Sequence, residues 1–81
     1  MDIIEYTEFL VKSIVKEPDM VKVKCFNSDE ESKIIEVIVH NSDIGAVIGR
    51  SGKTASALRT LIQAYAYVNN MKKVKINIDS F

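Results

Sequence analysis

The sequence predicts an α+β domain in which a three-stranded mixed sheet is covered on one face by three helices. Three observations lead to this fold class. Apolar residues recur at helical spacing in three segments and at strand spacing in three others. These segments follow one another in the order α-β-β-α-α-β. The last two strands are separated by two helices, and a connection of that length favours parallel pairing.

Three segments predict helices. Residues 2–16 carry apolar side chains three and four positions apart, with Asp2 as the N-cap and Pro18 as the residue that ends the helix. A short second helix is expected to begin after a cap at Asn41 or Ser42 and to end at Ile48. The third helix is predicted over residues 53–69. Its apolar residues at helical spacing are Ala55, Leu58, Leu61, Ile62, Tyr65 and Val68.

Three segments predict strands. The first is residues 20–27, which lead into a polar turn at Asn27, Ser28 and Asp29. The second is residues 33–40, and isoleucine or valine on both of its faces indicates a central strand. The third is residues 73–79, where apolar and polar residues alternate, so one face is expected to be buried and the other wet.

Length and composition limit the classes of protein. The chain has 81 residues, of which 47% are hydrophobic, so a single domain over residues 1–81 can build its own core. The single cysteine, Cys25, excludes an intrachain disulfide and indicates a reducing compartment. His40 is the only histidine and is expected to be structural or solvent-facing. We therefore expect a cytoplasmic protein with no membrane span, no metal site, no cofactor and no enzymatic activity.

The net charge of zero hides an uneven distribution. Residues 1–40 contain nine acidic and five basic side chains, whereas residues 41–81 contain two acidic and six basic ones. An acidic first half and a basic second half are compatible with modest phosphate binding at one end of the molecule.

The loop Gly49-Arg50-Ser51-Gly52, called the Gly-X-X-Gly loop below, carries the clearest functional signal. Gly49 stands where a helix commonly ends in a left-handed residue. Glycine at both ends lets the backbone turn sharply and leaves no Cβ in the way of a phosphate. The next helix points its N-terminal N–H groups at the same place, and Lys53 adds positive charge. These features predict a clamp for a nucleic-acid backbone.

A nucleotide-binding P-loop is the strongest alternative, because Gly52, Lys53 and Thr54 repeat the end of that motif. The motif also needs a glycine five positions before Gly52, where the sequence has Val47. It needs a strand directly before the loop, whereas residues 44–48 predict a helix. The sequence therefore argues against a nucleoside-triphosphatase.

The segment Val47-Ile48-Gly49-Arg50-Ser51-Gly52 matches the Val-Ile-Gly-X-X-Gly signature of the KH domain family, which the whole chain resembles in its type II topology. Further matches make the chain similar to the small bacterial stand-alone KH proteins of the KhpA group. They are Pro18-Asp19 before the first strand, Asp43-Ile44-Gly45 before the signature and Ala57-Leu58-Arg59 after it.

The resemblance implies a protein that binds single-stranded RNA, acts as a global post-transcriptional regulator or RNA chaperone, and is linked to cell elongation and division. It also implies a homodimer or a larger KH-containing partner. Transferred to this chain, the four loop residues would contact the RNA backbone, with Lys53 and Arg59 supplying further charge. The residues that would line the groove for the bases are Ile44, Gly45, Val47 and Ile48.

A protein-interaction or dimerisation module with the same fold and little RNA binding remains the second interpretation. Ile34 and Ile38 lie on the second face of the central strand, which suggests a covered surface and self-association.

Overall fold

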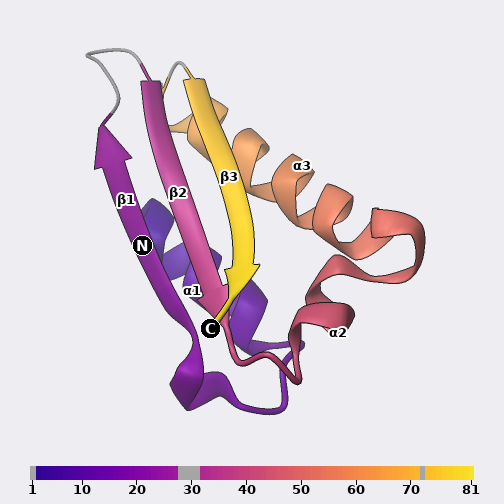
Figure 1. Cartoon of the computed structure of the whole chain (residues 1–81). Helices are drawn as coiled ribbons and strands as arrows, with labels where there is room; N and C mark the ends of the chain where they lie inside the picture. Colours follow the sequence, from indigo (N-terminus) through magenta and orange to yellow (C-terminus); the bar gives the residue numbers. More distant parts are fainter. Residues whose placement is uncertain (1, 28–31, 72) are drawn as a thin grey trace.

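The computed structural model describes residues 2–27, 32–71 and 73–81. The element order is α-β-β-α-α-β, which confirms the predicted fold class, and two short 3-10 helices are added to it. The bounds are α1 Ile3–Lys12, β1 Lys22–Asn27, β2 Ser32–Val39, α2 Ile44–Ile48, α3 Lys53–Val68 and β3 Lys73–Ser80. All three helices lie on one side of the sheet (Figure 1).

The sheet has the strand order β1-β2-β3, so β2 is the central strand as predicted. β1 runs antiparallel to β2, and β3 runs parallel to it. The predicted parallel pairing of the last two strands is therefore confirmed. The expected turn after β1 falls partly on residues 28–31, which lie outside the described residues.

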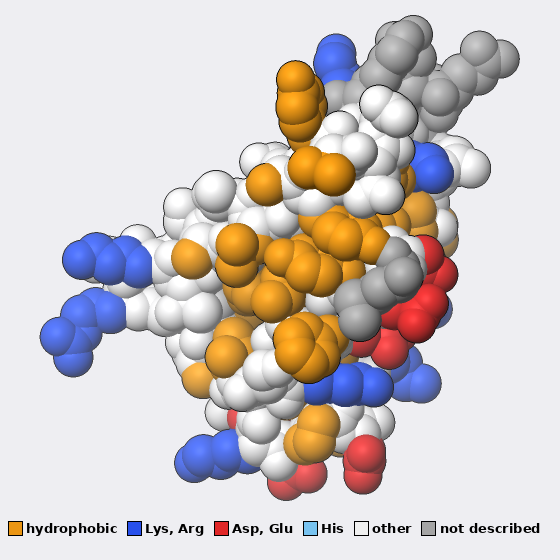
Figure 2. All heavy atoms as spheres, turned by 180° about the vertical axis from the view of Figure 1, so that it is seen from behind, with side chains coloured by type: hydrophobic (Ala, Val, Ile, Leu, Met, Phe, Trp, Pro, Cys, Tyr) orange, Lys and Arg blue, Asp and Glu red, His pale blue; other side chains and the backbone are white. Residues whose placement is uncertain are grey.

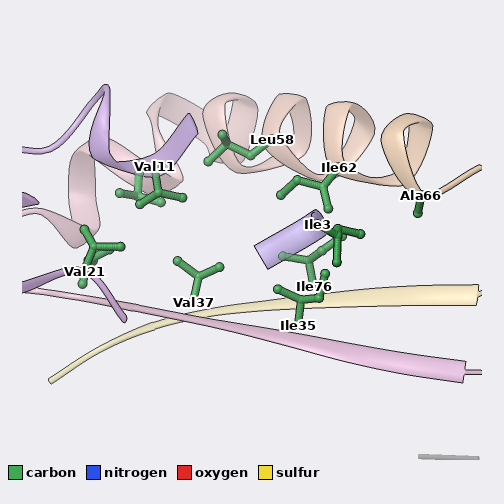
Figure 3. Packing of buried hydrophobic residues seen from close by; sticks show 11 residues of the cluster. Ile3, Val11, Val21, Ile35, Val37, Leu58, Ile62, Ala66 and Ile76 are labelled. Carbon is green, nitrogen blue, oxygen red and sulfur yellow. The ribbon is translucent and has the colours of Figure 1, made fainter. Parts of the chain in front are cut away.

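The core lies between the helices and one face of the sheet (Figure 3). Ile35 and Val37 on β2 are buried there, and Ile35 is the register partner of Ile76 on β3. α3 covers them with Leu58 and Ile62. A close ring stack, which no sequence pattern predicts, joins the helices. It brings Tyr6 of α1 and Tyr65 of α3 to a centroid separation of 4.3 Å.

The third helix buries a narrower stripe than its periodicity predicts. Ala66 is buried, although the sequence did not single it out, whereas Leu61 and Val68 are exposed. The expectation that these two residues face the core is wrong, because the sheet covers only one side of α3. No helix of the described part of the chain lies over the opposite face of the sheet, so Ile34 and Ile38 are half-buried rather than covered.

α1 ends at Lys12, four residues before the predicted end. The hydroxyl of Ser13 donates to the carbonyl of Phe9 at 2.6 Å and closes the last turn. Pro18 does not end this helix. It begins the 3-10 helix Pro18–Met20, which moves the start of the first strand from residue 20 to Lys22.

A buried carboxylate connects the segment after α1 to the start of α2. Asp43 is only 2% exposed, and its two oxygens accept hydrogen bonds from the backbone N–H groups of Lys16 and Glu17, both at 3.0 Å. Asp43 also occupies the N-cap position of α2, without a side-chain cap bond. The predicted cap at Asn41 or Ser42 is therefore wrong, since both residues lie in the preceding turn.

Candidate nucleic-acid interface

The Gly-X-X-Gly loop is a single 3-10 turn between α2 and α3, spanning Arg50–Gly52. It begins at Gly49, whose N–H donates to the carbonyl of Gly45 at 2.8 Å. The N–H of Gly52 then donates to the carbonyl of Gly49 at 3.1 Å. These two bonds tie the loop to the end of α2 and give it a defined path.

Gly49 cannot carry a side chain in this structure. Its φ is +78°, and a Cβ there would lie 2.7 Å from the Cβ of Thr54 and 2.8 Å from its backbone nitrogen. The positive φ agrees with the prediction that this residue ends the helix. Its ψ of 173° is extended, however, and so differs from the predicted left-handed helical conformation. The close approach to Thr54 packs the start of α3 against the end of α2.

Ser51 and Gly52 carry the left-handed conformation instead. Ser51 has φ 56° and ψ 27°, and Gly52 has φ 74° and ψ 13°. A left-handed residue with a Cβ costs about 1–2 kcal/mol, so Ser51 holds local strain. Residues under such strain cluster at binding and catalytic sites. The sequence did not identify this feature, because serine has no marked preference for that conformation.

Gly52 differs from Gly49 in what surrounds it. A Cβ added to Gly52 would meet no atom within 4 Å. Gly52 also precedes the first residue of α3, where no side chain caps the helix. The N-terminal N–H groups and the positive end of the helix dipole therefore face the open side of the loop. Arg50 and Lys53 are both exposed beside it.

Gly45 is the second glycine with open space around it. It lies in α2 and is exposed, and a Cβ added there would meet no atom within 4 Å. Its φ is not among the positive values of the chain, so backbone conformation does not require glycine here. Glycine inside a helix costs about 0.5–1 kcal/mol relative to alanine. The fold alone therefore gives no reason for this residue.

The predicted groove residues divide into two layers. Ile44 and Ile48 are half-buried and Gly45 is exposed, so each keeps some accessible surface. Val47 has no exposed surface and belongs to the core. Val47 therefore has no surface with which to line the predicted groove.

Arg59 lies on α3 and reaches the free edge of β3. Its Nε donates to the carbonyl of Ile76 at 3.3 Å. One turn further along α3, Nε2 of Gln63 lies 3.5 Å from the carbonyl of Val74. These side chains form a polar seam between α3 and β3 that begins near the loop. Only Arg59 was predicted, since nothing in the sequence distinguishes Gln63 from other exposed polar residues.

The structure brings the predicted residues to one end of the molecule. Figure 1 shows α2, the loop and the first turn of α3 together at that end, and basic side chains project from the same edge in Figure 2.

Within residues 2–27, 32–71 and 73–81, no three histidine, cysteine or carboxylate side chains are grouped to hold a metal ion. No helix in this described part has the length and apolar character needed to cross a bilayer.

Comparison with family models gives a match over residues 5–78 to the family described as "KhpA/KhpB, KH domain". The chain belongs to the KhpA/KhpB KH-domain family. The match confirms the resemblance to the KH family that the signature at residues 47–52 indicated, and the element order agrees with the type II topology.

Members of the KhpA/KhpB family from several bacteria are similar to this chain over most of its length. An RNA-binding protein KhpA from Borreliella burgdorferi is 44% identical over 75 residues, covering 93% of this chain and 89% of the relative. One from Streptomyces coelicolor is 50% identical over 60 residues, covering 74% of this chain and 75% of the relative. Identity at this level over most of both chains supports the family assignment.

A solved structure shows the same fold at low identity. The protein Era, in complex with MgGDPNP and nucleotides 1506-1542 of 16S ribosomal RNA, matches 98% of this KhpA/KhpB family member with a TM-score of 0.69 and 14% identity. The match covers 30% of the Era chain. It supports the fold alone.

Proposed function

We propose that this chain binds single-stranded RNA in a groove closed by the Gly-X-X-Gly loop. One observation carries the proposal: two backbone positions without a Cβ, Gly45 and Gly52, face open space on either side of the cationic Arg50. The fold does not require Gly45, and a helix N-terminus opens toward Gly52. A polynucleotide backbone is a ligand that needs such close approach and positive charge.

Each residue has a separate role in this proposal. The N–H groups of the first turn of α3 that are not bonded within the loop would donate to phosphate oxygens. Arg50 and Lys53 would neutralise phosphates as exposed cations. Ile44 and Ile48 would support the bases. Arg59 would extend the positive rim along α3.

The test is a double variant, Arg50→Asp with Ser51→Asp, which reverses the charge of the loop. Aspartate tolerates the left-handed conformation of Ser51 better than most residues, so the fold should survive. We expect ultraviolet crosslinking to cellular RNA to be lost while the thermal melt remains two-state and close to that of the wild type. Crosslinking that persists in the folded double variant would refute the loop as the site.

The matched control is Lys22→Asp with Asn27→Asp, which changes the net charge by the same amount. Both residues are exposed on β1, at the edge of the sheet away from α3. Crosslinking of this variant should stay near the wild-type level. An equal loss in both double variants would mean that overall charge, and not the loop, controls RNA binding.

A dimerisation or protein-interaction module is the second candidate, and an exposed apolar surface favours it. Phe9 on α1 is 61% exposed, and Leu61 and Val68 on α3 are 46% and 77% exposed. Apolar side chains gather over the helix side of the molecule in Figure 2. An exposed patch of this kind is typical of an interface. The proposed partner is a second copy of the chain or a larger KH-containing protein.

Native mass spectrometry of the wild type and of Val68→Asp tests this second candidate. A dimer that becomes a monomer on this substitution would support it, and a monomeric wild type would count against self-association. Wild-type protein that never crosslinks to RNA, but does dimerise, would favour the interaction module over RNA binding. The wider role we propose, a cytoplasmic post-transcriptional regulator or RNA chaperone linked to cell elongation and division, rests on family resemblance.

A further inference from the structure

A pocket lies at the far end of α3 from the Gly-X-X-Gly loop. It has a volume of about 590 Å³ and opens between the C-terminal half of α3 and the beginnings of β2 and β3. This volume is within the range of ligand-binding pockets, roughly 300–1,000 Å³. No sequence motif indicates this pocket, because its walls come from three separate segments of the chain.

The walls of the pocket combine cationic and apolar groups. Lys33, Lys73 and Lys75 line it, and none of the lining residues that the structure describes is acidic. Its apolar part includes Ala66, which is buried, and the ring of Tyr67, which is 83% exposed. An anion with a flat apolar portion complements such walls. Phosphate groups pair with lysine, and bases stack on an exposed aromatic ring.

The pocket continues the seam between α3 and β3. Gln63 belongs to the seam through its contact with the carbonyl of Val74, and both residues also line the pocket. Arg59 lies one turn closer to the loop along the same helix. Lys53 and Gln63 are ten positions apart on α3, which corresponds to about 15 Å along the helix axis. The seam formed by Arg59 and Gln63 therefore reaches the pocket.

We propose that this pocket is a second nucleotide subsite, which holds a further nucleotide of the same RNA strand that the loop grips. The inference rests on the proposed function of the loop and extends it. A KH loop clamps about four nucleotides, so a strand that also occupies the pocket must be longer. The base would stack on Tyr67, and the flanking phosphates would pair with Lys73 and Lys75. Two weak contacts on one strand then give a stronger overall affinity.

The test compares two RNA lengths in a fluorescence anisotropy titration. The probes are fluorescein-labelled oligoadenylate and oligouridylate of about four and about ten nucleotides, chosen from the reach of the loop. The first variant is Lys73→Gln with Lys75→Gln, and the second is Tyr67→Ala. The matched control is Lys22→Gln with Lys24→Gln, which removes two strand lysines from the opposite edge of the sheet.

The wild type should bind the longer probe more tightly than the shorter one. Lys73→Gln with Lys75→Gln should weaken binding of the longer probe by about 10–25-fold at 0.1 M salt and make its salt slope shallower by about 1.4. Tyr67→Ala should weaken it by about fivefold or more. Neither variant should change binding of the shorter probe by more than about twofold, and the control should behave as the wild type at both lengths.

The outcomes separate this inference from the proposed function. If the wild type binds both lengths and the pocket variants match it, the subsite is refuted while the loop proposal stands. If Arg50→Asp with Ser51→Asp leaves binding of the shorter probe intact, the loop proposal fails and this inference fails with it. Adenosine monophosphate is the last probe. If it binds the wild type as tightly as the longer oligonucleotide does, the pocket is a site for a free nucleotide, which overturns the assignment to the strand.

Discussion

Replacing Gly45 by alanine should raise the stability of the protein and weaken its RNA binding. The two effects have opposite signs because the fold does not need this glycine, whereas the proposed groove does. When a substitution lowers affinity and stability together, the loss of binding is hard to interpret. Gly45→Ala avoids this ambiguity.

The size of each effect follows from the surroundings of Gly45. A methyl group there meets no protein atom within 4 Å, so it adds no clash in the free protein. Removing glycine from a helix reduces the freedom of the unfolded chain, which should stabilise the protein by about 0.5 kcal/mol. If RNA packs against this backbone, the methyl group overpacks the complex at a cost of about 1–2 kcal/mol. That cost corresponds to a Kd about 5–30-fold weaker.

Urea denaturation followed by circular dichroism measures the stability, and fluorescence anisotropy with a short oligonucleotide measures the binding. Ala64→Ser is the matched control. It adds one non-hydrogen atom on an exposed position of α3 and should leave the Kd unchanged. Gly49→Ala provides the contrast in stability, since a Cβ there collides with Thr54.

One result would refute the reasoning about the groove. If Gly45→Ala gains stability and binds RNA with the wild-type Kd, no ligand approaches this part of α2, and the groove must lie elsewhere around the loop. If the variant instead loses stability, the helical environment of Gly45 has been misjudged, and its binding data then carry no weight.

Three further predictions concern the loop and its support. Asp43→Ala should lower the free energy of unfolding by about 3 kcal/mol, and Asp43→Asn by about half of that, because the amide oxygen keeps one acceptor; equal losses in urea denaturation would contradict this. Gly49→Ala should lower the free energy of unfolding by about 2–3 kcal/mol and Gly52→Ala by only about 1 kcal/mol, since only a Cβ at position 49 meets Thr54. The reverse order of melting temperatures would show that the loop has a different path. The affinity for a short single-stranded RNA should fall with salt at a log–log slope of about −2, as expected for three phosphate contacts, and a slope near zero would mean that no phosphates are bound.

The fold class could be predicted because it depends on periodic patterns that the chain shows clearly. The alternation in residues 73–79 and the two-sided apolar pattern of residues 33–40 each specify a strand and its position in the sheet. Helix boundaries were harder to predict. The segment after α1 is held by Asp43, which accepts hydrogen bonds from backbone groups 26 and 27 residues away, and a local pattern does not contain such a contact.

The candidate site was predictable to a similar degree. A short signature marks the Gly-X-X-Gly loop, and the structure brings its predicted neighbours together. The burial of Val47 was not predictable, because an apolar residue beside a loop can face either the core or the groove. The position of Arg59 was only partly predictable for the same reason. Its charge was evident, but its bond to Ile76 depends on how α3 packs against the edge of β3.

The hydrogen bonds of Asp43 have a consequence for how related sequences can differ. Its carboxylate holds the backbone N–H groups of residues 16 and 17, not their side chains, and both of these side chains are exposed. Positions 16 and 17 are therefore free to accept almost any residue except proline, which has no N–H to donate. Position 43 has no such freedom. A statistical search for correlated substitutions would find no coupling between these positions, although two long-range hydrogen bonds join them.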